Sequence, residues 1–207
     1  MTRKIKIATL QLPAWTAGET EAERKQFRVD ALHHWLEAAG EEGADLVCMG
    51  ETCTGEQLVE DAYTGPTTQL VLTVAARYQM HVVLPILAKV EGELRNTALV
   101  IDSCGKIVGR YDKVHPTRSE MCKGVTAGDD FPVFDLTFGR IGICICHDIS
   151  FPESTRVLGL RGAELIAPHE RRRWLVDWRH RCRSRIAHGD QSLAARHRHA
   201  QRQFSES

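Results

Sequence analysis

The stretch from residue 140 to residue 153 constrains the fold of this chain more than any other. It begins with an apolar run, Ile141 to Ile145, which is typical of a buried strand. Pro152 and Glu153 then favour the start of a helix, because proline suits the first helical turn and a glutamate stabilises the positive end of the helix dipole. Cys146 therefore lies where a strand ends and the chain turns, and ligands of open α/β sheets bind at that edge.

A cysteine in this position is a candidate nucleophile. Solvent exposure, backbone N–H donors and a helix N-terminus all favour the thiolate form of Cys146. The alternative is a structural thiol in the core, which is where cysteines most often lie. Cys144 lies two residues earlier and so points to the same face of the strand, and we expect it to be such a core thiol.

Predicted strands and helices alternate along the first 167 residues. Strands are predicted at 4–12, 44–49, 80–87, 95–101, 107–111, 132–135 and 140–146, and another begins at 164. Helices are predicted at 19–40, 67–79 and 152–162, and the first is expected to bury Phe27, Ala31, His34, Trp35 and Ala38. Residues 112–131 form a polar connection, and one of this length inside a compact domain is usually functional. Together these elements indicate a layered α/β fold.

Two charged residues follow other predicted strands directly. Glu51 comes after the strand at 44–49, and Lys113 comes after the strand at 107–111. Taken singly, each is more often a solvated surface residue. Chemistry on an α/β scaffold is normally assembled on loops that follow strands. We therefore expect Glu51, Lys113 and Cys146 to share one site.

These motifs resemble those of the nitrilase superfamily, the carbon–nitrogen hydrolases. The pattern around the nucleophile of that family is an apolar strand, Cys, any residue, Asp, two residues and Phe-Pro-Glu, and it is matched here by Cys146, Asp148, Phe151, Pro152 and Glu153. Glu51 matches the first catalytic Glu, and Lys113 matches the Lys of a Tyr-x-Lys-x-His pattern. Asn96-Thr97-Ala98 and Gly105-x-x-x-Gly109 match the hairpin before that Lys.

The resemblance implies an αββα-sandwich and a covalent mechanism. Cys146 would be the nucleophile and Glu51 the general base and acid. Lys113 and the backbone N–H of His147 would stabilise the negative charge of the intermediate. Glu120, where many members place a second Glu, would support Lys113. The implied substrate is a small amide or nitrile that reacts with water, and the chemistry requires no metal or other cofactor.

The residue after the nucleophile bears on the substrate. In true nitrilases the Cys is usually followed by Trp-Glu, whereas here it is followed by His147 and Asp148. That difference favours an amide or carbamoyl-amide substrate, with nitrile hydrolysis as the alternative.

The composition changes near residue 168, where the resemblance ends. Residues 169–207 contain ten Arg, no Lys and four acidic residues, so this segment carries a charge of +6 while the whole chain has a net charge of zero. We expect a hydrolase domain over residues 1–167, incomplete in its second half, and an atypical Arg/His-rich tail over 168–207. Residues 169–207 are expected to add no strand to the second sheet.

This tail is open to three interpretations. It is disordered or a loosely docked helix with Trp174, Trp178 and Ile186 on one face, it binds nucleic acid through its arginines, or it binds metal through His197 and His199. The first is favoured, because Arg runs are usually solvated, and a nucleic-acid partner is not expected.

Two classes of function follow. One is an active carbon–nitrogen hydrolase, and the other is a catalytically impaired remnant whose fold is incomplete. Uncovered sheet edges would favour association, so we expect a homo-oligomer. Seven cysteines at irregular spacing, no apolar run long enough for a membrane and no signal-peptide core at the start indicate a cytoplasmic protein.

Overall fold

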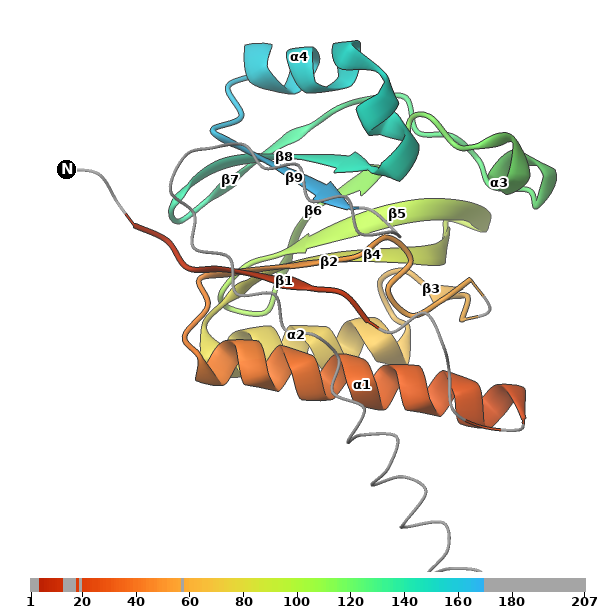
Figure 1. Cartoon of the computed structure of the whole chain (residues 1–207), viewed down its shortest axis with the longest axis vertical. Coiled ribbons are helices and arrows are strands. Elements are labelled where there is room, and N and C mark those ends of the chain that lie inside the picture. Colours follow the sequence, from red (N-terminus) through yellow and green to blue (C-terminus); the bar gives the residue numbers. More distant parts are fainter. Residues whose placement is uncertain (1–3, 13–17, 19, 57, 170–207) are drawn as a thin grey trace, which may run out of the picture.

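Two β-sheets stacked face to face form the centre of the molecule, with helices on both outer sides (Figure 1). The computed structural model describes residues 4–12, 18, 20–56 and 58–169. Helices α1 and α2 cover the first sheet, and helix α4 covers the second (Figure 1). The predicted αββα-sandwich is therefore confirmed. Within the described residues, no helix is both long enough and apolar enough to cross a membrane.

The first sheet brings the ends of several strands to one edge. Its strands are β1 (Ile7–Leu10), β2 (Leu46–Met49), β4 (His81–Val90), β5 (Glu93–Ile101) and β6 (Ile107–Asp112) in that order, and the short β3 (Glu60–Asp61) also pairs with β4. Strands β1, β2 and β4 are parallel, whereas β5 is antiparallel to both β4 and β6. Strand β6 therefore runs in the direction of β2 and β4. The carboxyl ends of these three strands, and the start of β5, lie at the same edge.

The second sheet has three strands within the part of the chain that the structure describes. They are β7 (Val133–Leu136), β8 (Gly139–Ile145) and β9 (Leu165–His169), with β8 antiparallel to β7 and parallel to β9. Helix α4 (Pro152–Leu160) connects β8 to β9. Strand β9 continues through Pro168 and His169, two residues past the predicted end of the hydrolase domain. The rest of the tail, with its predicted helix face and histidine pair, lies outside the described residues.

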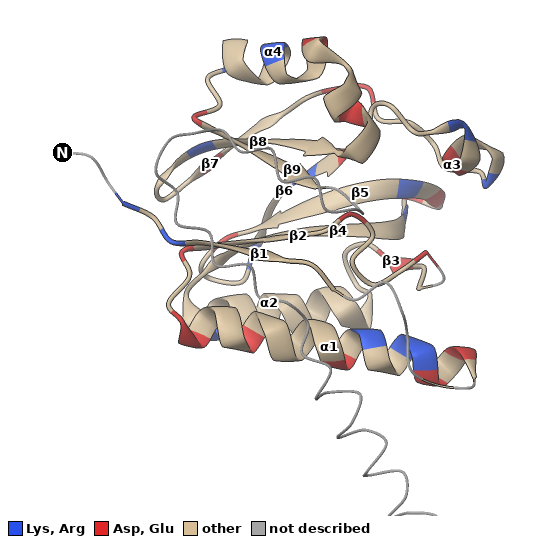
Figure 2. Ribbon diagram, viewed as in Figure 1, with Lys and Arg blue, Asp and Glu red and all other residues tan. Residues whose placement is uncertain are grey.

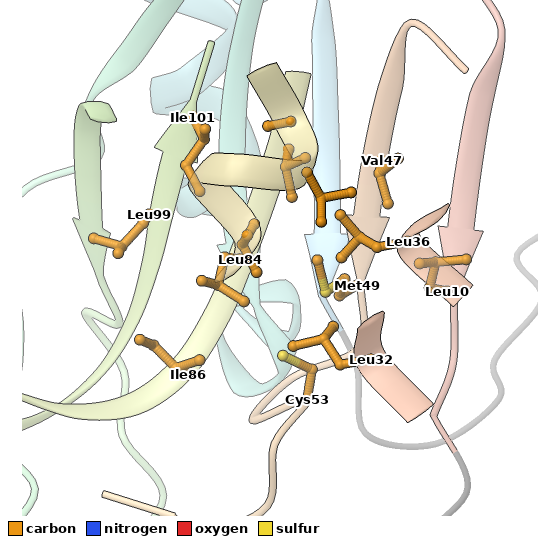
Figure 3. Close-up of a cluster of buried hydrophobic side chains, with 14 of the residues drawn as sticks. Leu10, Leu32, Leu36, Val47, Met49, Cys53, Leu84, Ile86, Leu99 and Ile101 are labelled. Atoms are coloured by element: carbon orange, nitrogen blue, oxygen red, sulfur yellow. The ribbon is translucent and has the colours of Figure 1, made fainter. Parts of the chain in front are cut away.

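Two apolar clusters hold the four layers together. One lies between the first sheet and helices α1 (Glu21–Glu41) and α2 (Pro66–Tyr78), and Figure 3 shows part of it. The other lies between the sheets and is built largely from β2, β5 and β8. The ribbons of the central strands carry few charges, whereas helix α1 carries many (Figure 2). The continuous burial of residues 81–88 in β4 agrees with a strand that is covered on both faces.

The buried face of α1 differs from the predicted one. Phe27 and Ala31 are buried as expected, but the deepest residues are Leu32 and Leu36, and Figure 3 shows both beside the strands of the first sheet. His34 is exposed. The buried apolar face of α1 is thus rotated by about one residue from the predicted face. The reason is that burying two leucines at a four-residue spacing stabilises the fold more than burying an imidazole.

Helix α3 (Arg118–Cys122) lies within the polar connection identified at residues 112–131. It begins at Thr117, whose hydroxyl accepts a hydrogen bond from the backbone of Glu120, while the Glu120 side chain bonds back to the backbone of Thr117. This reciprocal pair is a capping box, and its signature is the Thr-x-x-Glu pattern at residues 117–120.

Candidate active site

Glu51 lies in the turn that follows β2, and it is 8% exposed. The next residue, Thr52, has a φ of 45°, in the left-handed region. That backbone conformation is uncommon for a β-branched residue and costs on the order of 1–3 kcal/mol. The turn is fixed by a backbone hydrogen bond of 3.0 Å from Cys53 to Pro85 of β4. The chain therefore turns sharply directly after Glu51, and this turn is held against β4.

Lys113 follows β6 and is almost fully buried, with 1% exposed. Its backbone N–H donates to the carbonyl of Asn96 on β5 at 2.9 Å. Its ammonium lies 2.7 Å from Glu51 Oε1 and donates to both oxygens of Glu120, at 2.8 and 3.0 Å. Burial alone would lower the pKa of Lys113, but the bonds to Glu120 and Glu51 outweigh burial and raise that pKa.

Glu120 is held by its own helix as well as by Lys113. Its Oε2 accepts hydrogen bonds from the backbone N–H of Thr117 at 2.7 Å and from the Thr117 hydroxyl at 2.8 Å. Burial acts to raise the pKa of Glu120, but the bonds from Lys113, Thr117 and Asn96 lower it to about 2. Glu120 is therefore ionised at any pH near neutrality.

Asn96 completes this cluster from β5. Its side-chain Nδ2 donates to Glu51 Oε1 at 2.8 Å and to Glu120 Oε1 at 2.6 Å. We call Glu51, Asn96, Lys113 and Glu120 the acid–lysine cluster. Its formal charge, with Lys113 counted as positive and both glutamates as negative, is −1.

Cys146 begins the short 3₁₀ helix η1 (Cys146–Ser150) directly after β8. Its φ of 46° lies in the left-handed region, so the chain bends sharply at this residue. Cys146 is half-buried and packs against the cluster between the sheets. His147 is the next residue, and its N–H precedes the first hydrogen bond within the helix, so it has no acceptor there.

The other cysteines of the core differ from Cys146 in burial. Burial raises the pKa of Cys48 and of Cys53 to about 12. Burial, and then the charge of Asp148, raises the pKa of Cys144 to about 12 as well. Cys144 is fully buried, so its prediction as a core thiol is confirmed.

Asp148 ties the turn at Cys146 to the loop that carries Lys113. This buried carboxylate accepts hydrogen bonds from the Tyr111 hydroxyl at 2.6 Å and from the backbone N–H of His115 and of Ile145, each at 2.9 Å. The His115 ring nitrogen Nδ1 lies 2.9 Å from the same carboxylate. Burial and the neighbouring Asp148 charge raise the pKa of Tyr111. Tyr111 therefore stays a neutral donor.

The structure thus relates the predicted site residues in two ways. Glu51, Lys113 and Glu120 are joined by direct hydrogen bonds. Cys146 and His147 are joined to the Lys113 loop through Asp148 and through a contact of 3.2 Å from His147 Nδ1 to the His115 carbonyl. In addition, His169 Nδ1 lies 2.5 Å from the carbonyl of Met49, so the end of β9 reaches the end of β2. All these loops therefore meet at one edge of the sandwich.

Asn96, Tyr111 and Asp148 matched family motifs in the sequence, but the motifs assigned them no role. Each is buried, and each makes hydrogen bonds to groups far away in the chain. A polar residue inside an apolar strand, such as Asn96, was the available signal, since a buried polar group needs a partner.

A family model described as "Carbon-nitrogen hydrolase" matches residues 6–203. Among curated proteins, a probable nitrilase of Schizosaccharomyces pombe is 34% identical over 127 residues, covering 59% of this chain and 46% of the relative. A β-ureidopropionase of Arabidopsis thaliana is 31% identical over 154 residues, covering 66% and 38%. A nitrilase of Pyrococcus abyssi is 34% identical over 142 residues, covering 64% and 54%. The chain thus spans about half the length of the curated relatives or less.

Solved structures share the fold at lower identity. A carbon-nitrogen hydrolase from Helicobacter pylori G27 has a TM-score of 0.67 and 23% identity, covering 79% of this chain and 59% of the other. An amidase from Nesterenkonia sp. has a TM-score of 0.66 and 20% identity, covering 79% and 64%. Both likenesses concern the arrangement of the four layers.

Proposed function

The chain belongs to the carbon-nitrogen hydrolase family, and we propose that it hydrolyses the carbon–nitrogen bond of a small amide or carbamoyl amide through Cys146, Glu51 and Lys113. The acid–lysine cluster is the observation that carries this proposal. It places a buried ammonium against two carboxylates at the edge where the turn of Cys146 is anchored. A buried, charged constellation of this kind is typical of catalytic sites.

In the first half of the proposed reaction, Glu51 takes the proton of the Cys146 thiol. The thiolate attacks the carbonyl carbon, and a carbon–sulfur bond forms as the carbonyl electrons move onto oxygen. Lys113 and the N–H of His147 stabilise that oxyanion. When the intermediate collapses, the carbon–nitrogen bond breaks and Glu51 gives its proton to the departing amine. The product is a thioester on Cys146.

In the second half, water replaces the amine. Glu51 removes a proton from the water as the water oxygen attacks the thioester carbon. The carbon–sulfur bond then breaks, the electron pair goes to sulfur, Glu51 gives its proton to Cys146 to restore the thiol, and the carboxylic acid leaves. Glu120 acts on Lys113 rather than on the substrate, because its strong hydrogen bonds hold the ammonium charged and in place.

The proposal is tested by ammonia release from a panel of short aliphatic amides and N-carbamoyl amino acids. We expect turnover that is abolished in Cys146→Ala and lowered on the order of 10²–10⁴-fold in Glu51→Gln. Mass spectrometry of the rapidly quenched protein should find the acyl group on Cys146. Ammonia release that survives in Cys146→Ala would overturn the proposed nucleophile.

Nitrile hydrolysis is a second candidate, because two of the curated relatives are named as nitrilases. The same assay with nitriles and amides of equal chain length separates the two activities. Attack at a carbon–nitrogen triple bond is needed to release ammonia from the nitriles but not from the amides. If Cys146 is alkylated selectively and neither substrate class releases ammonia, the catalytically impaired hydrolase is favoured instead.

The setting of the enzyme is also part of the proposal. We place it in the cytoplasm, where the seven cysteines of the chain would stay reduced. We further propose a homo-oligomer, which light scattering of the purified chain would test.

A further inference from the structure

Both amide hydrogens of Asn96 are donated in hydrogen bonds to carboxylate oxygens. Asn96 is 1% exposed, and its Nδ2 lies within hydrogen-bond distance of Glu51 Oε1 and Glu120 Oε1. Ionised carboxylates only accept hydrogen bonds, so the amide nitrogen, and not the amide oxygen, must face them. The orientation of the Asn96 side chain is therefore fixed by chemistry.

The opposite end of the same amide is left without a partner. Asn96 Oδ1 is buried, and it accepts no hydrogen bond from any residue in the described part of the chain. Buried acceptors are nearly always satisfied, so an exception requires an explanation. The explanation lies with the donor end of the amide, because turning the side chain over to satisfy Oδ1 would place an oxygen against two carboxylates.

The two carboxyl oxygens of Glu51 are not equivalent. Lys113 and Asn96 both donate to Oε1, at 2.7 and 2.8 Å. Oε1 of Glu51 is thus held from two sides, and Oε2 is the oxygen that neither Lys113 nor Asn96 occupies.

We propose that Asn96 is a positioning residue that commits Glu51 to act through one oxygen, Oε2. This inference rests on the proposed function, in which Glu51 accepts the thiol proton. The S–H bond of Cys146 breaks, the proton goes to Oε2, and the electron pair stays on sulfur. Asn96 also places its positive amide hydrogens between the carboxyl groups of Glu51 and Glu120.

Two substitutions separate positioning from packing. Asn96→Leu keeps the approximate shape of the side chain and removes both donors together with the unpaired Oδ1. Asn96→Asp keeps the shape, removes both donors and adds a negative charge. Thr97→Val is the matched control, because it removes one buried hydrogen bond, to the Tyr111 carbonyl at 3.2 Å, from the neighbouring position of the same strand.

The measurement is the rate of Cys146 carboxymethylation by iodoacetamide from pH 5 to pH 10, followed by peptide mapping of the full chain. We expect the midpoint of this profile to rise by about one unit or more in both Asn96 variants, which lowers the rate at neutral pH about tenfold. Thr97→Val should lower the melting temperature and leave the midpoint unchanged. Once an amide substrate is known, Asn96→Leu should lower kcat with little change in KM.

The outcomes are distinct. Folded Asn96 variants with the wild-type midpoint would overturn the role of Asn96. If Cys146 of the wild-type chain reacts no faster than exposed Cys104 and Cys122, the proposed function itself fails, whatever the variants do. Should both variants unfold, the side-chain NH₂ signals of Asn96 in the NMR spectrum of the wild-type chain still decide. They should be protected from exchange and shift in Glu51→Gln, and signals that stay unchanged would contradict the proposal.

Discussion

At the scale of single residues, the buried ammonium of Lys113 explains why two carboxylates can lie together in the interior. An ammonium removed from water is stable only when it is paired and fully hydrogen-bonded. Lys113 has one carboxylate oxygen of Glu51 and both oxygens of Glu120 as acceptors. Asn96 and Thr117 satisfy the same carboxylates from other sides. The cluster is therefore a single unit, and removing one member affects all the others.

Glu120 should make the stability of the protein depend on acid pH. Its pKa is lowered to about 2 in the folded chain, so its stabilising effect is present above its unfolded pKa and is lost as the pH falls toward 2. That effect is about 3 kcal/mol, at 1.4 kcal/mol per unit of pKa. Urea unfolding between pH 3 and pH 6 should show a steeper loss of stability in the wild type than in Glu120→Gln.

The control for this prediction is Glu37→Gln, which removes a carboxylate from a surface pair with Arg77 at 2.8 Å. It should change the free energy of unfolding by less than about 1 kcal/mol, with the wild-type dependence on pH. Parallel curves for the wild type and Glu120→Gln would show that the Glu120 carboxylate gives no such stabilisation.

Cys146 should be the most reactive thiol of the sandwich. It is partly exposed at a helix start, whereas burial raises the pKa of Cys48, Cys53 and Cys144. Brief iodoacetamide treatment near neutral pH, followed by peptide mapping, should label Cys146 before any of these three. Preferential labelling of Cys144 would contradict the assignment of the nucleophile. Cys182, a cysteine of the tail that competes with Cys146 for the reagent, lies outside the described residues.

At the scale of elements, the turn after β8 depends on a carboxylate from its own sequence. Asp148 bonds to Ile145 at the start of the turn and to Tyr111 and His115 around the Lys113 loop. Two loops from different sheets are therefore held by one buried side chain. This explains how the first sheet can fix the position of a nucleophile that belongs to the second.

Asp148→Ala should loosen both loops at once. It leaves several buried donors unpaired, each of which costs about 1–3 kcal/mol, so we expect a total loss of at least about 3 kcal/mol. Hydrogen exchange should become faster at residues 113–115 and 145–149 together. Asp135→Ala, which removes a surface partner of Arg140, is the control and should leave exchange in both loops unchanged. Faster exchange in one loop alone would argue against a shared anchor.

The face of α1 that packs on the first sheet can be tested by a pair of truncations. Leu36→Ala removes a fully buried side chain and should destabilise the protein by about 2–5 kcal/mol. His34→Ala changes an exposed position two residues away and should stay within about 0.5 kcal/mol. Chemical unfolding of both variants measures the difference, and equal losses would restore the face that the sequence predicted.

At the scale of the whole molecule, the two apolar clusters draw their members from residues 7 to 167. The first sheet contributes to both clusters, so the layers should unfold together. We therefore propose that residues 1–169 form the folding unit, which includes all of β9. Deleting residues 170–207 should leave a single cooperative thermal transition within a few degrees of the full chain. Loss of the cooperative transition, or aggregation of the shortened chain, would show that the domain extends into the tail.

The sequence by itself determined the layers and the loops that carry the chemistry. Runs of apolar residues must be buried, so the pattern of residues alone locates strands β2, β4 and β8. Glu51, Lys113 and Cys146 each follow a strand, which is a local property of the chain. The capping box of α3 is equally local, because its two partners are three residues apart.

The tertiary structure alone decided which atoms of these groups bond to one another. Lys113 and Glu51 are 62 positions apart, and Asn96 and Glu51 are 45 apart. Their hydrogen bonds exist because β5 is antiparallel to β4 and β6 is antiparallel to β5, so that β6 again runs in the direction of β2 and the ends of β2 and β6 lie at one edge with the start of β5. The rotation of α1 and the anchoring role of Asp148 were decided in the same way. Both depend on packing between distant segments, and a pattern of neighbouring residues carries no information about such contacts.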